Sequence, residues 1–129
     1  MLLSIDEKDS RPIYQQLVSQ VREQVSKGIL KPGDELPSVR ELAESLGVNM
    51  HTVRSAYLRL RDQGIISLRL GRRARIAGTP PIPGPEDKAD LEARFRELVT
   101  DARLAGLDPE DIRGIIENLL NESKEGNDR

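Results

Sequence analysis

The sequence has 129 residues, with 20 basic and 22 acidic side chains, a formal net charge of −2 and 36% apolar residues. This length fits one small domain, or one domain with an appendage. The absence of cysteine excludes disulfide scaffolds and cysteine-bound zinc, and a single histidine, His51, leaves little basis for a metal site. No stretch resembles a membrane span or a signal peptide, so we expect a cytoplasmic protein without cofactor, metal or membrane partner.

A proline-rich segment, residues 79–85, divides the chain and holds four of the eight prolines. This composition cannot continue a helix and favours an extended linker. Residues 1–78 carry 13 basic and 9 acidic side chains, net +4, whereas residues 79–129 carry 7 and 13, net −6. The uneven charge predicts that only the first part meets a polyanion, although two solvated surfaces that differ by chance would look the same.

In the first part, apolar residues at helical spacing predict a helix over residues 11–27, with Ser10 as its cap and Pro12 near its first position. Gly28 ends this helix, and a turn follows at residues 31–34. The apolar stripe of the helix consists of Ile13, Leu17, Val21 and Val25.

Two short helices follow the turn. Ser38 and Glu41 have the spacing of a capping box, in which two side chains satisfy free backbone N–H groups at a helix start. We therefore predict a helix that begins after Ser38 and ends at Gly47. Asn49 then caps a third helix over residues 50–63. Its inward stripe consists of Val53, Ala56, Tyr57 and Leu60.

After the third helix the apolar period changes to two. Ile66, Leu68 and Leu70 alternate with polar residues, which predicts a strand. A turn at residues 71–73 and a return over residues 75–77 complete a hairpin with a basic tip. The basic side chains of this hairpin are Arg69, Arg72, Arg73 and Arg75.

Two further amphipathic helices are predicted within residues 86–123, before a frayed tail over residues 124–129. Asp108 and Pro109 mark the start of the second one. Such short helices cannot bury their apolar stripes alone, so we expect the core of a homodimer rather than a ligand box. The stripes consist of Leu91, Phe95, Leu98 and Ala102, and of Ile112, Ile115, Ile116, Leu119 and Leu120.

The order of these elements is that of a winged helix-turn-helix domain over residues 1–78, followed by a helical dimerisation region. The predicted fold class is mainly α with a small β-hairpin. An α-helix fits the major groove of B-DNA, and a basic hairpin, the wing, can reach the neighbouring groove or the phosphates. The function that this order favours is sequence-specific DNA binding.

In that geometry the first turns of the third helix face base edges. Arg54 can form a fork on guanine, His51 can hydrogen-bond to a base, and Met50 can touch a thymine methyl group. Ser38 and Arg40 start the preceding helix, where contact with phosphate is favoured. The predicted DNA-contacting residues are Ser38, Arg40, Asn49, Met50, His51, Thr52, Arg54, Arg69, Arg72, Arg73 and Arg75. Each arginine could instead be an ordinary solvated side chain.

Several spaced motifs resemble the DNA-binding domain of GntR-family bacterial transcription regulators. They include LPSVRELA at residues 36–43, LGVNMHTVR at residues 46–54 and LRDQGII at residues 60–66. The resemblance extends over residues 11–76. It implies DNA contacts for the residues of matching type, which are Ser38, Arg40, Thr52 and Arg54.

The chain departs from the family pattern at two places. Met50 stands where the family often has arginine, and His51 stands where a small polar residue is common, so the resemblance implies no operator sequence. In the wing, Gly71 is kept, but residues 73–75 read Arg-Ala-Arg in place of Gly-Thr-Phe. This wing is more electrostatic than the family's usual one.

About 44 residues follow the linker, too few for the large metabolite-binding domains of most of the family. Two short helices in this space resemble the YtrA-like subfamily, whose tail serves for dimerisation. The resemblance implies a homodimer that represses bacterial promoters by binding a double-stranded DNA operator with two half-sites related by two-fold symmetry.

Other functions stay open. A small-molecule effector could bind between the DNA-binding part and the tail helices and change their relative angle. A protein-interaction adaptor could use the tail helices, with DNA binding secondary. We do not expect an enzyme, because the sequence shows no nucleophile elbow, P-loop or metal-ligand cluster.

Overall fold

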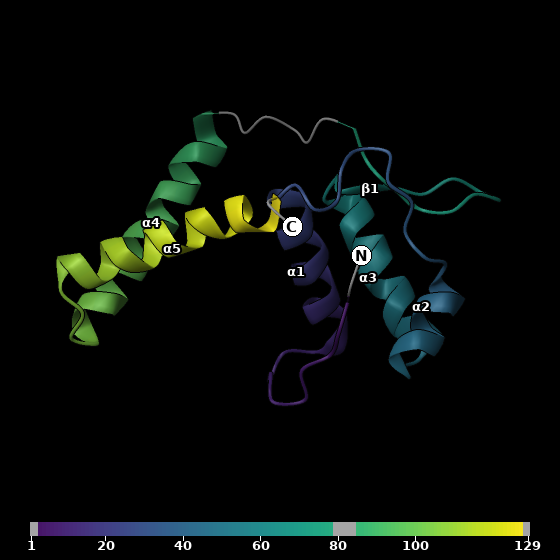
Figure 1. The fold of residues 1–129 in the computed structure, drawn as a ribbon, viewed down its shortest axis with the longest axis horizontal. Helices are drawn as coiled ribbons and strands as arrows, with labels where there is room; N and C mark the ends of the chain where they lie inside the picture. The colour runs from purple at the N-terminus through teal and green to yellow at the C-terminus, as the bar shows by residue number, and fades with distance from the viewer. Residues whose placement is uncertain (1–2, 79–84, 128–129) are drawn as a thin grey trace. The chain divides into compact units, whose positions relative to one another are not determined.

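The computed structural model describes residues 3–78 and 85–127. The chain divides into two compact units, Met1–Pro80 and Pro81–Arg129 (Figure 1). The helices are α1 (Ile13–Ser26), α2 (Val39–Leu46), α3 (Met50–Asp62), α4 (Pro85–Leu104) and α5 (Pro109–Asn127), and the strands are β1 (Ile66–Ser67) and β2 (Arg75–Ile76). The predicted mainly helical fold with a small hairpin is confirmed. The predicted linker lies outside the described residues except at Pro85, which begins α4 because proline suits the first helical position.

Helix α1 starts later than a cap at Ser10 would place it, so that prediction is wrong. Pro12 occupies the cap position, with φ −53° and ψ 150°, and no side chain caps the helix. The fixed φ of proline directs the chain into the helix at this point. The predicted inward residues Leu17 and Val21 are buried in the core.

Local caps hold both ends of α2 and the start of α3. Ser38 Oγ accepts a hydrogen bond from the Glu41 backbone N–H at 3.1 Å, and the Glu41 carboxylate accepts one from the Ser38 N–H at 3.4 Å, which confirms the capping box. Gly47 ends α2 with a φ of 68°, a conformation that glycine adopts without strain. Asn49 Oδ1 then accepts from the His51 N–H at 2.7 Å and caps α3.

Helix α3 supplies the centre of the core and packs against both α1 and α2. The predicted stripe is confirmed, with exposures of 0–3% for Val53, Ala56, Tyr57 and Leu60. The Tyr57 hydroxyl donates to the Pro37 carbonyl at 2.6 Å and so connects α3 to the start of α2. Burial of the Tyr57 phenol raises its pKa.

The hairpin is shorter than the alternation predicts. Ile66 pairs with Ile76 and Ser67 pairs with Arg75 in antiparallel register, and the ladder of β1 ends there. Leu68 and Leu70 lie beyond the paired residues and Leu70 is fully exposed, so the prediction of a strand that reaches Leu70 is wrong. With only two paired residues in each strand, no layer covers the tip.

The second strand is also paired on its other side. The Leu36 N–H donates to the Ala74 carbonyl at 2.9 Å, and the Ile76 N–H donates to the Asp34 carbonyl at 2.9 Å. Glu35 forms an isolated antiparallel bridge with Arg75. The base of the wing is therefore attached to the segment before α2, which period-two patterning in residues 66–77 does not predict.

The second unit contains no buried side chain among residues 88–122. Its turn is capped as predicted, because the Asp111 N–H donates to Asp108 Oδ1 at 2.9 Å and the Asp108 N–H donates to Asp111 Oδ2 at 3.0 Å. Helix α5 continues to Asn127, into the tail that we expected to be frayed, since no proline interrupts it. Residues 128–129 lie outside the described residues.

Replacement of Leu60 by alanine removes fully buried apolar volume and is expected to lower the free energy of unfolding by about 2–5 kcal/mol. The matched control is Leu58→Ala, because Leu58 lies on the exposed side of the same helix. Urea titration followed by circular dichroism measures both variants. Equal losses for the two variants would contradict the assigned core face of α3.

Tyr57→Phe removes the hydrogen bond to Pro37 and is expected to lower the free energy of unfolding by about 1 kcal/mol at neutral pH. Because folding raises the pKa of Tyr57, the wild type loses stability as pH rises past about 10, where the unfolded tyrosine ionises. Phenylalanine does not titrate, so the difference should shrink there. Urea titrations at neutral and alkaline pH test this, and a pH-independent difference would contradict it.

Candidate nucleic-acid interface

The face of α3 opposite the buried stripe is open at its first turns. Met50 is 45% exposed, and the side chains of His51 and Arg54 are exposed as well. His51 and Arg54 have no side-chain hydrogen bond or ion pair to any residue that the structure describes. Spacings of three and four residues place these side chains on one side of the helix. The structure thus brings together the residues predicted to read bases.

Three other predicted contact residues border this face. Thr52 is half-buried, and Asn49 uses Oδ1 to cap α3 while its amide nitrogen keeps two donors. Ser38 uses its hydroxyl oxygen in the capping box of α2. These side chains therefore hold the helix ends in place whether or not they also touch DNA.

Arg40 lies in the first turn of α2, where it is exposed and has no hydrogen-bonded or ionic partner within 3–78 or 85–127. The N-terminus of a helix carries a partial positive charge and free N–H groups, which attract phosphate. This position is confirmed as the start of a helix, as the sequence predicts.

The four wing arginines form two groups. Arg69 and Arg72 at the tip are exposed, and their guanidinium groups form no hydrogen bond or ion pair with any residue that the structure describes. The guanidinium groups of Arg73 and Arg75 instead form ion pairs with carboxylates of the first unit. Arg75 Nη2 lies 2.6 Å from Glu35 Oε1, and its Nη1 donates to the Gly33 carbonyl at 3.1 Å.

Arg73 forms a two-point ion pair with Glu41. Its Nη2 lies 2.6 Å from Oε1, and its Nη1 lies 2.9 Å from Oε2. The hydrogen bonds from Arg73 lower the pKa of the Glu41 carboxyl. The capping box predicts one role for Glu41, and this second partner, 32 residues away, has no local signal in the sequence.

The wing arginines also share one concave surface. A hollow of about 480 Å³ is lined by backbone and side chains of the wing and of the segment before α2. Its lining includes Arg69, Arg72, Arg73 and Arg75. Four arginine residues line this one hollow, which makes it a cationic surface of the first unit.

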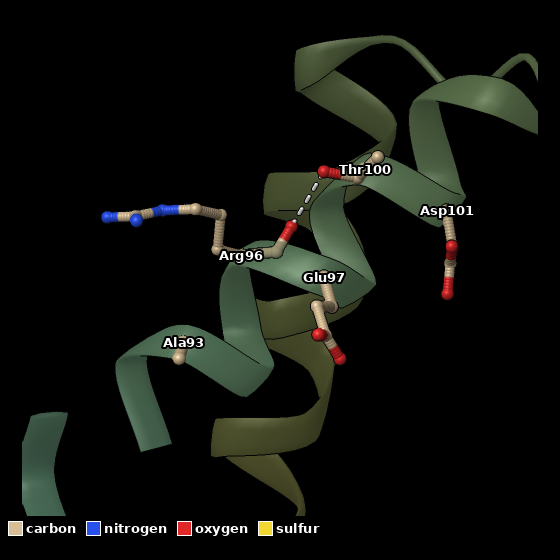
Figure 2. A pocket seen from close by; sticks show the side chains of 5 residues that line it. All are labelled: Ala93, Arg96, Glu97, Thr100 and Asp101. Carbon is tan, nitrogen blue, oxygen red and sulfur yellow. Dashed lines mark hydrogen bonds between the residues drawn. The ribbon is translucent and has the colours of Figure 1, made fainter. Parts of the chain in front are cut away.

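A hollow in the second unit gives no comparable site. It is lined by Ala93, Arg96, Glu97, Thr100 and Asp101, all on α4 (Figure 2). Thr100 Oγ1 donates to the Arg96 carbonyl at 3.0 Å, and the side chains in Figure 2 point in different directions rather than toward a common point. This arrangement does not gather the groups that a small ligand needs.

Neither described range contains a helix with the length and apolar content that crossing a membrane requires. Within these ranges there is also no cluster of three His, Cys, Asp or Glu side chains placed to bind a metal ion.

Comparison with known proteins agrees with this geometry. Residues 13–76 match the family of bacterial regulatory proteins described as the gntR family. The chain is 37% identical over 126 residues to the HTH-type transcriptional repressor YtrA of Bacillus subtilis (strain 168), and the match covers 97% of each protein.

Solved structures show the same fold. A transcriptional antiterminator from Listeria monocytogenes EGD-e matches with a TM-score of 0.85 and 31% identity, over 95% of this chain and 92% of that one. The DNA-binding domain of AraR in complex with operator ORE1 matches with a TM-score of 0.50 and 25% identity, over 60% of this chain and 94% of that one. The chain belongs to the GntR family of bacterial transcription regulators, and it is a DNA-binding regulator with a winged helix-turn-helix domain.

Proposed function

We propose that this chain is a dimeric repressor that acts in the cytoplasm by occupying an operator with two symmetric half-sites. One observation carries the proposal: Met50, His51 and Arg54 form an exposed, unpaired face on a helix whose other face is locked in the core. Such a helix presents donors and apolar groups to the major groove at a fixed angle. The repressor name of the Bacillus subtilis relative supports the sign of regulation.

The contacts with phosphate fall to the cations around this face. Arg40 at the start of α2 and the tip residues Arg69 and Arg72 keep their charges unpaired among the described residues. Such contacts set the register of the protein on the duplex without reading sequence. Arg73 and Arg75 add to the same basic surface, although part of their charge is compensated by neighbouring carboxylates.

The second unit supplies the proposed dimer contact. Phe95, Leu98 and Leu119 are 58–64% exposed, and none of residues 88–122 is buried. A soluble chain rarely leaves so much apolar surface in water, and a second copy can cover it. The proposed contact residues are Leu91, Phe95, Leu98, Ala102, Ile112, Ile115, Ile116, Leu119 and Leu120.

The other two functions are not favoured by a specific observation. The relatives lend no support to a protein-interaction adaptor. A small-molecule effector between the DNA-binding part and the tail helices stays a prediction, and the hollow along α4, whose side chains point in different directions, does not favour one.

Arg54→Ala is expected to weaken binding to the preferred operator by about 1–3 kcal/mol and to relax base preference at the position that Arg54 reads. The probe is the duplex that the wild type selects from random DNA, and fluorescence anisotropy measures affinity. Arg61→Ala is the matched control, because Arg61 lies at the other end of α3 and pairs with Asp62. Unchanged operator affinity of Arg54→Ala would remove Arg54 from the proposed interface.

Phe95→Glu places a charge in the proposed dimer contact and is expected to give a monomer in sedimentation equilibrium. Because the two half-sites are then no longer bound together, affinity for the full operator should fall about 100-fold or more, while affinity for one half-site stays the same. Thr100→Glu adds the same charge to the polar hollow of α4 and serves as the control. A dimeric Phe95→Glu protein would contradict the proposed contact.

A further inference from the structure

The wing tip is attached to helix α2 by one side chain. Residues 68–73 have a single backbone hydrogen bond of their own, from the Arg72 N–H to the Arg69 carbonyl at 3.1 Å. The base of the wing is held by β1, β2 and the segment before α2, but that ladder ends before the tip. Within the described residues, the hydrogen bonds between the tip region and α2 come from the Arg73 side chain.

The geometry of this contact orients the two elements. The guanidinium of Arg73 meets both oxygens of Glu41, at 2.6 and 2.9 Å, and a two-point contact of this kind fixes direction as well as distance. Both side chains are about half exposed, so solvent screens the pair and it adds little to overall stability. Its effect is therefore on where the wing lies rather than on whether the domain folds.

Glu41 is itself held at a fixed place. Its carboxylate also accepts the Ser38 N–H at 3.4 Å, and the neighbouring Pro37 carbonyl accepts the hydroxyl of the buried Tyr57. The wing is thus connected through Arg73 to a point that is fixed relative to α3.

We propose that Glu41 and Arg73 are positioning residues for DNA binding. Their ion pair holds the wing so that Arg69 and Arg72 reach phosphates at a set distance from the base-reading face of α3. In this role Arg73 pairs with Glu41 and does not contact phosphate. The inference rests on the proposed function and adds to it a contact that controls the wing.

The test compares Glu41→Gln, Arg73→Gln and the double variant on the duplex that the wild type selects from random DNA. Glutamine at position 41 preserves the capping box but cannot form the charged pair. We expect each single variant to lose about tenfold in affinity, with the double variant no weaker than either single one. Glu44→Gln is the matched control, because it removes the same charge from the exposed side of the same helix and should not weaken binding.

The opposite role for Arg73 predicts a different result. If Arg73 contacts phosphate and Glu41 only competes for it, Glu41→Gln removes a competitor and tightens binding. Tighter binding by Glu41→Gln, or independent losses that multiply in the double variant, would overturn the proposal.

A second measurement follows the wing without DNA. Backbone ¹⁵N relaxation of residues 69–72 should report greater motion in Glu41→Gln than in Glu44→Gln, at an almost unchanged melting temperature. Equal wing motion in the two variants would overturn the positioning role. If the wild type selects no duplex from random DNA, the proposed function is wrong. If the wild type selects a duplex, and Glu41→Gln and Glu44→Gln bind that duplex with equal affinity, only the positioning role is wrong.

Discussion

Burial of one stripe of α3 determines what the first unit presents to DNA. Val53, Ala56 and Leu60 are 0% exposed on a helix that packs against α1 and α2, so the helix cannot rotate about its axis without exposing them. The opposite side must then face solvent, and it carries His51 and Arg54. A helix offered to a groove in a fixed rotation can discriminate between bases, whereas a mobile one would contribute charge alone.

Charge acts differently in the structure from what its count in the sequence indicates. The wing contributes four arginines, but Arg73 and Arg75 are engaged by Glu41 and Glu35 within the protein. These ion pairs neutralise part of the positive charge of the wing and hold the wing to the segment around the start of α2. The net charge of −2 likewise combines a basic first part with an acidic second part, so it describes neither.

Local signals predicted the helices and their caps, except the cap at Ser10, whereas contacts between distant residues were beyond them. The Ser38 capping box, the Gly47 stop and the α3 stripe depend on residues within a few positions of one another, and all three are confirmed. Alternation alone predicted a strand that reaches Leu70, but strand length depends on which segments pair, and pairing ends at Ser67. The Glu41–Arg73 pair joins residues 32 apart, so no spacing rule reveals it.

Exposed apolar residues on the second unit indicate where a second copy of the chain would bind. Its two helices leave their apolar residues exposed, and a second copy related by two-fold symmetry would double the sequence that the regulator reads. Selection of bound sequences from random duplex DNA at moderate salt tests this account most directly. A two-fold symmetric regulator is expected to select one enriched motif of two inverted half-sites, spaced by about one helical turn of 10–10.5 base pairs or a multiple of it. Recovery of no enriched motif would contradict this account.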